Sequence, residues 1–213
     1  PTYLTPVMMQ KLIDYGYLDQ APEKQNYVIG FYSVVFAKNK DLVKGWLSNL
    51  NIDQYQAGAF MRALRHSHLI QIAKNWAQEK GWVYEDTSIF EKLSPVIEDD
   101  LKTGEDIQRL WGAYTASGDK AYLEKLFARM HETNIALNKE EIDQGNFDSL
   151  RARTLSDLIA GLFVNASIQY PQVEDFIKAK AATPSLTEDE QIQSIIAYIY
   201  EQKTGLSKEI DAQ

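Results

Sequence analysis

The chain has 213 residues, 45% of them hydrophobic and 24% charged, as in one ordinary globular domain or two small ones. Its formal net charge of −8 argues against a nucleic-acid-binding protein, which needs a basic face to neutralise phosphates. It has no cysteine, which excludes disulfide bonds, thiolate metal ligands and a cysteine nucleophile. No apolar run approaches the ~20 residues that cross a bilayer, so no membrane span is predicted.

The first part of the chain has the pattern of successive amphipathic helices. Thr5 is expected to be an N-cap, with Pro6 at the first helical position. Asp53 is expected to cap the fourth helix, and Gly81 to end the fifth. The periodicity predicts helices over residues 5–16, 23–38, 40–50, 54–66 and 69–80.

An irregular stretch, 82–103, separates these helices from a second set. Ser94-Pro95 interrupts any helix there, because proline disfavours helical geometry in the residue before it. Residues 134–146 are polar and are expected to form a connection. Thr187 and Glu190 have the spacing of a capping box. The second set is predicted over residues 106–117, 120–130, 147–170, 171–182 and 187–204.

Strand signals are nearly absent, because no alternating apolar runs are flanked by tight-turn sequences. We therefore predict an all-α protein of about ten helices in antiparallel hairpins, either a solenoid-like stack or a helical bundle. It is expected to form a single domain, 1–213. Two halves, 1–81 and 104–205, joined by the irregular stretch 82–103, are the other organisation that the pattern allows.

A pattern that occurs twice predicts an internal duplication. Residues 31–47 form an apolar helical face, a turn at Asn39 and a second amphipathic helix, and residues 110–126 do the same around Gly118. Such self-similarity is the usual mark of stacked helical hairpins. From residue 31 to residue 110 the offset is 79 residues, not the ~34 of a tetratricopeptide unit. The spacing suits repeats of four helices or two diverged halves.

The segment 110–122, LWGAYTASGDKAY, resembles one in uncharacterised helical proteins of bacteria. The block 31–47 and the segment 163–166, followed by Pro171 and Val173, occupy similar relative places in those proteins. The chain is also loosely similar to tetratricopeptide and Sel1-like repeats. The resemblance to the uncharacterised bacterial proteins extends over roughly residues 31–177. It implies a bacterial origin and a helical-repeat fold, leaves open whether the protein is exported, and assigns no catalytic residue.

Four residues are candidates for a peptide-binding groove: Tyr32, Arg62, Trp111 and Tyr114. Amphipathic aromatic side chains make good anchors at interfaces, and an arginine is able to bind a carboxylate of a partner. The same aromatics at helical spacing are also typical of core packing, and Arg62 of a solvated face.

No metal site and no cofactor are predicted. His66 and His68 sit at a helix–helix turn, where positions two apart point away from each other, so they are expected to be exposed or to cap a helix. Acidic residues at 98–100, 105 and 106 lack the ligand order of an EF-hand loop and are expected to form a solvated face. The sequence has no Gly-rich phosphate loop, HExxH or GxSxG motif.

The leading hypothesis is a non-enzymatic helical-repeat protein that binds another protein or a peptide in a groove. Two alternatives stay open: an enzyme whose histidines and carboxylates converge from distant helices, and a structural module that associates with itself as a homo-oligomer. The chain starts at Pro1 and not at methionine. We therefore expect either an exported protein whose signal has been removed or a trimmed cytoplasmic one.

Overall fold

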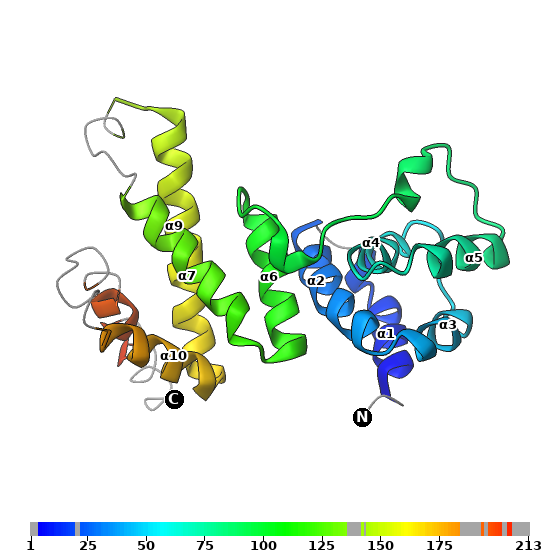
Figure 1. Ribbon diagram of the computed structural model, residues 1–213, viewed down its shortest axis with the longest axis horizontal. Helices are drawn as coiled ribbons and strands as arrows, with labels where there is room; N and C mark the ends of the chain where they lie inside the picture. Colours follow the sequence, from blue (N-terminus) through cyan, green and yellow to red (C-terminus); the bar gives the residue numbers. More distant parts are fainter. Residues whose placement is uncertain are drawn as a thin grey trace. The chain divides into compact units, whose positions relative to one another are not determined.

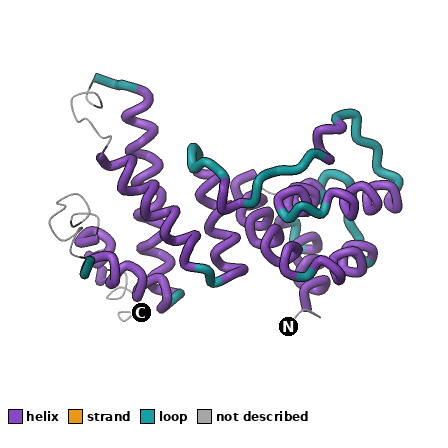
Figure 2. Tube along the Cα trace, in the orientation of Figure 1, coloured by secondary structure: helices purple, strands orange, loops and turns teal. Residues whose placement is uncertain are grey.

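The chain is all-α, as predicted, and its number of helices fits the expected ten or so. In the computed structural model (Figure 1) none of the described residues lies in a strand, and all regular structure among them is helical (Figure 2). The helix predicted over 187–204, with its capping box, falls mostly outside these residues. The structure describes residues 4–19, 22–135, 142, 144–183, 193, 196–201 and 204–205.

The chain divides into two compact units, Pro1–Tyr122 and Leu123–Gln213, and each is described by itself. The boundary between them falls inside helix α7 (Lys120–Ile135). The irregular stretch 82–103 belongs entirely to the first unit, where it contains two short 3₁₀ turns, Thr87–Phe90 and Val96–Glu98.

The helices of the first unit follow the predicted order. Thr5 begins the first helix, with Pro6 in its first turn, but the N-cap is Leu4 and no side chain caps the helix. The prediction of Thr5 as N-cap is therefore wrong by one position. The elements are α1 (Thr5–Asp14), the 3₁₀ turn η2 (Tyr17–Asp19), α2 (Pro22–Lys38), α3 (Lys40–Ser48), α4 (Gly58–His66), α5 (Ile70–Lys80) and α6 (Gly104–Ser117).

Local sequence signals explain where several of these helices begin and end. Gly81 and Gly118 adopt left-handed conformations, with φ of 69° and 67°, directly after α5 and α6. The start of α6 has a capping box in which Thr103 and Asp106 bond each other's backbone N–H groups. The carboxylate of Asp53 accepts from a backbone N–H three residues later, in a turn that precedes α4. Asp53 therefore caps this turn and not α4 itself, which begins at Gly58, about one turn later than predicted.

Helix α2 is the central helix of the first unit, because every residue from 25 to 36 is buried or half-buried. It packs most extensively on α6 and next on α4. The approach to α6 is very close, since a Cβ added to Gly30 would lie 1.8 Å from the carbonyl oxygen of Arg109. Reciprocally, a Cβ on Gly112 would lie 2.1 Å from the carbonyl oxygen of Tyr27. Each helix thus contributes a glycine where the two backbones meet.

Aromatic side chains fill the space between α2 and α4. The ring of Tyr32 meets that of Phe60 edge to face at 5.2 Å between centroids, and Phe36 lies beside both. Further along, Trp76 of α5 packs edge to face on Trp82 at 4.9 Å. Such geometries are those that aromatic pairs prefer. These rings belong to a core to which α1, α2, α3, α4 and α5 all contribute buried side chains.

The second unit has a phenylalanine core. The helices of this unit whose bounds are described are the rest of α7, which runs to Ile135 instead of the predicted 130, α9 (Phe147–Gln169) and α10 (Pro171–Ala181). Rings of Phe127, Phe163 and Phe176, one from each helix, have centroids 6.0 to 6.4 Å apart. Burial of these three rings joins the helices of this unit.

Candidate functional site

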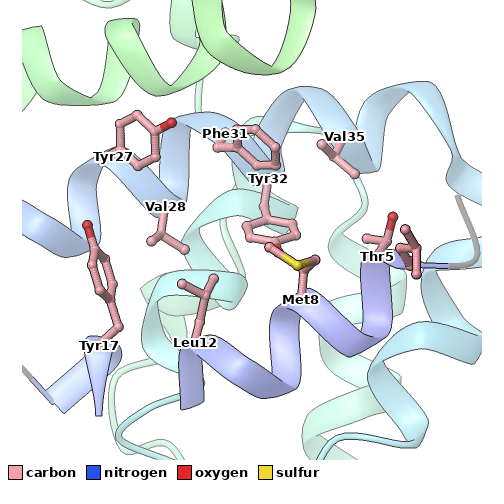
Figure 3. A pocket seen from close by; sticks show the side chains of 10 residues that line it. Thr5, Met8, Leu12, Tyr17, Tyr27, Val28, Phe31, Tyr32 and Val35 are labelled. Carbon is pink, nitrogen blue, oxygen red and sulfur yellow. The ribbon is translucent and has the colours of Figure 1, made fainter. Parts of the chain in front are cut away.

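A pocket of about 530 Å³ lies between α1 and α2 in the first unit (Figure 3). The side chains of α2 that face it recur at intervals of three and four residues, so they form one stripe of the helix. Helix α1 supplies the opposite wall, and η2 closes one end with a tyrosine. The described residues that line the pocket are Leu4, Thr5, Met8, Leu12, Tyr17, Tyr27, Val28, Phe31, Tyr32 and Val35.

The pocket exists because α1 is apolar on two adjoining faces. One face, with Met9 and Ile13, is buried in the core and holds α1 against α3 and η2. The other face carries Leu4, Met8 and Leu12, spaced four residues apart, and these side chains line the pocket. Because the first face fixes the position of α1, the second face is left opposite α2 without filling the space between them.

The lining is uncharged among the described residues, and its polar atoms are hydroxyl groups. The hydroxyl of Tyr27 lies 2.9 Å from Oγ1 of Thr115 in α6, so this tyrosine is already hydrogen-bonded. Tyr32 is buried, with 3% of its surface exposed, and burial raises its pKa well above the ordinary value for a phenol. Tyr32 therefore stays protonated and neutral in the wall of an apolar pocket.

The outer side of α1 continues the apolar surface beyond the pocket. Leu4, Val7 and Met8 are 42%, 49% and 55% exposed. Val7 does not line the pocket, whereas Leu4 and Met8 stand at its edge. Large exposed apolar side chains gathered on one short helix are a feature of surfaces that meet other molecules.

Of the four candidate residues from the sequence, Tyr32 lies in the pocket wall and the other three do not. Trp111 and Tyr114 are buried in α6, with ring centroids 5.0 Å apart. Arg62 is exposed on α4. The structure therefore pairs Trp111 with Tyr114 and brings Tyr32 together with residues of α1 that were not expected.

Sequence reasoning missed the contribution of α1 and η2, chiefly Met8, Leu12 and Tyr17. A signal was present, because Leu4, Met8 and Leu12 recur every fourth residue beside the row formed by Met9 and Ile13. Two apolar rows on one short helix indicate that it faces more than the core.

The end of α4 holds the segment 91–94 through its side chains. Nδ1 of His66 lies 2.6 Å from the carbonyl oxygen of Ser94, and Nε2 of His68 lies 3.1 Å from that of Leu93. Nε of Arg65 donates to the carbonyl oxygen of Glu91 at 2.7 Å. His68 is exposed as expected, but His66 is buried. These histidines thus anchor a loop through backbone carbonyls.

Burial lowers the pKa of His66, against the opposing effects of its bond to Ser94 and of the charge of Asp99. A hollow of about 340 Å³ borders the same loop and is lined by His68, Lys92, Ser94 and Glu98, among others. His66 is not among its described lining residues. The hydrogen bonds of His66 and His68 are with backbone carbonyl oxygens and not with a carboxylate, so they do not form the pair of titrating groups that acid–base catalysis needs.

Two of the acidic residues singled out in the sequence belong to a partly buried network around Arg109 of α6. Nε of Arg109 donates to Asp99 at 3.0 Å, Nη1 donates to Asn26 of α2 at 2.8 Å, and Nη2 donates to Asp106. The side chains of Arg109, Asp99 and Asp106 are 15% to 17% exposed. This network joins α2, α6 and the segment before α6, so these two carboxylates do not form the expected solvated face.

In the described part of the chain, no three His, Asp or Glu side chains converge as metal ligands. The described helices also include none with the length and hydropathy to cross a membrane. No protein-family model matches the chain, and no match was found among curated proteins or among solved structures.

Proposed function

We propose that this protein is a non-enzymatic binding protein that holds a small, mostly apolar molecule between α1 and α2. The observation that carries the proposal is the pocket itself. Its volume of about 530 Å³ lies in the range of roughly 300–1,000 Å³ typical of small-molecule sites, and its described lining is apolar apart from hydroxyl groups.

The chemistry of the lining supports binding and not catalysis. Thr5, Tyr17, Tyr27 and Tyr32 supply hydroxyl groups, and no described lining residue is a carboxylate, an imidazole or an amine. General acid–base catalysis needs a group that titrates near the working pH within hydrogen-bond reach of the substrate. Burial moves the pKa of Tyr32 away from that range.

The test uses N-phenyl-1-naphthylamine, a neutral probe whose fluorescence rises in apolar sites. Val35 is half-buried and lines the pocket, so Val35→Trp places an indole in the space that the probe needs. We expect its affinity for the probe to fall at least about tenfold, which corresponds to ~1.4 kcal/mol. The matched control is Val7→Trp, outside the pocket on the exposed side of α1, which should bind within about twofold of wild type. Equal binding by both variants would refute the assignment of the site.

A second candidate function is binding of another protein, as the sequence predicted. The exposed residues Leu4, Val7 and Met8 favour it, because a small molecule in the pocket leaves Val7 uncovered. An amphipathic helix of a partner would cover this side of α1 and insert an apolar side chain into the pocket. Val7→Glu separates the two functions: it should abolish capture of a protein partner and leave probe binding unchanged.

A further inference from the structure

The hydroxyl of Tyr32 lies in the wall of the pocket without a hydrogen-bond partner among the described residues. The ring is held by contacts with Phe31, Phe36 and Phe60, and the residue is 97% buried, since only 3% of its surface is exposed. Within the described ranges its hydroxyl makes no hydrogen bond. Figure 3 shows the side chain directed from α2 toward the wall formed by α1.

The other two tyrosines of the pocket differ from Tyr32 in this respect. Tyr27 shares a hydrogen bond with Thr115, and Tyr17 is only half-buried, so water reaches it. The hydroxyl of Tyr32 is not among the enclosed unpaired side-chain atoms of the described residues, so water in the pocket reaches it although no protein group bonds it. Because Tyr32 lies in the pocket wall, a molecule bound in the pocket is able to supply the hydrogen-bond partner of its hydroxyl.

We infer that Tyr32 selects the ligand of this pocket: a neutral, mostly apolar molecule that carries a hydrogen-bond acceptor, such as a carbonyl oxygen, for the Tyr32 hydroxyl. The inference rests on the proposed function and names the ligand class of the same site. Neutrality follows from the lack of charge among the described lining residues, because a buried ion there would have no counter-charge.

The selection has a simple physical origin. A ligand without a polar group displaces water from the Tyr32 hydroxyl and leaves it desolvated without a partner. A ligand with an acceptor replaces that water with a hydrogen bond. The preference between two such ligands therefore measures the desolvation of one hydroxyl group, and it should disappear when the hydroxyl is removed.

The experiment compares two probes of nearly the same shape, 2-acetylnaphthalene and 2-isopropylnaphthalene, in wild type and in Tyr32→Phe. The hydrocarbon is the more hydrophobic probe, but this difference is common to both proteins and cancels in the double ratio. We expect the ratio of ketone to hydrocarbon affinity to be about 5- to 100-fold higher in wild type, equivalent to ~1–3 kcal/mol at ~1.4 kcal/mol per factor of ten. Most of the change should come from tighter binding of the hydrocarbon to Tyr32→Phe.

The matched control is Tyr17→Phe, which removes a hydroxyl that water solvates from the same pocket and should shift the ratio less than about twofold. The carbonyl stretch of 2-acetylnaphthalene bound to wild type supplies a readout independent of any variant, because a hydrogen bond lowers its frequency relative to an aprotic solvent. An unchanged ratio in Tyr32→Phe, or an unshifted stretch, overturns the role of Tyr32 while the pocket stands. If neither probe binds wild type, the proposed function and this inference both fail.

Discussion

Replacing Gly30 with alanine tests the close packing of α2 on α6. The added Cβ would lie 1.8 Å from the carbonyl oxygen of Arg109 and 2.6 Å from its carbonyl carbon. Both atoms belong to the backbone of α6, so no side-chain rotation relieves the clash. Since non-bonded carbon atoms are most stable at ~3.5–4.0 Å, the two helices have to separate by more than ~1 Å.

Three terms set the net change in the free energy of unfolding: two losses and one gain. Overpacking of this kind destabilises by about 1–3 kcal/mol. The hydrogen bonds from Arg109 to Asn26 and between Tyr27 and Thr115 cross the same interface at 2.8 and 2.9 Å, and each contributes ~1 kcal/mol. Alanine gains ~1 kcal/mol over glycine in helix propensity. The free energy of unfolding should therefore fall by about 2–4 kcal/mol, a large share of the ~5–15 kcal/mol of a typical domain.

Urea unfolding followed by tryptophan fluorescence measures this change in the first unit alone, because all four tryptophans, at 46, 76, 82 and 111, belong to it. Gly112→Ala should act in the same direction, since its Cβ would lie 2.1 Å from the carbonyl oxygen of Tyr27. Gly45→Ala is the control: nothing lies within 4 Å of the added Cβ on the exposed side of α3, so it should stabilise by up to ~1 kcal/mol.

The close approach of α2 and α6 would be contradicted if Gly30→Ala had the unfolding midpoint of wild type or shifted it in the direction of Gly45→Ala. Either result would mean that the backbones of α2 and α6 are far enough apart to accept a methyl group. A loss in Gly30→Ala with no loss in Gly112→Ala would contradict the reciprocal contact and leave one close approach.

Three further predictions concern other parts of the molecule. Arg109→Leu should destabilise the first unit by about 2–4 kcal/mol, because it removes a donor shared by Asn26 and two largely buried carboxylates. A change below ~0.5 kcal/mol in the free energy of urea unfolding would contradict this role of Arg109. The stability of the first unit should decrease as pH falls from ~7 to 5. Burial holds the pKa of His66 below the ~6.5 of the unfolded chain, so the unfolded chain binds a proton first. The charge of Asp99 opposes this lowering of the pKa, and the charges of Arg109 and Arg65 add to it. Urea unfolding of His66→Gln at several pH values should show a weaker slope, and an unchanged slope would assign it to other groups. Phe163→Ala should lower the stability of the second unit by about 3–5 kcal/mol, because this fully buried ring packs on Phe127 and Phe176. A circular dichroism melt indistinguishable from that of wild type would show that the three rings do not form the core of this unit.

Helix positions were predictable because their signals are local. Periodicity of apolar residues and the stops at Gly81 and Gly118 depend on residues within one or two turns, and the structure has helices ending there. The cap at Thr5 failed because capping depends on the backbone of the residues that precede it, which the sequence does not reveal.

The candidate site was only partly predictable. Aromatic residues at helical spacing look alike whether they fill a core or line a pocket, so Tyr32 was named together with Trp111 and Tyr114. What distinguishes Tyr32 is the position of α1, which is fixed by its packing on α3 and η2 and not by any feature of α2. The importance of Gly30 and Gly112 was likewise invisible, because it arises only where the two helices cross.

The pairing of α2 with α6 also bears on how the chain folds during synthesis. Gly30 and its contact at Arg109 are 79 positions apart, so at ~5–20 residues per second α2 leaves the ribosome about 4 to 16 seconds before its main partner is complete. During that interval only elements that precede α6 are available to cover α2. Its residues from 25 to 36 are all buried or half-buried in the folded chain. Helix α4, completed earlier, is the natural first cover, and α6 then closes the remaining side.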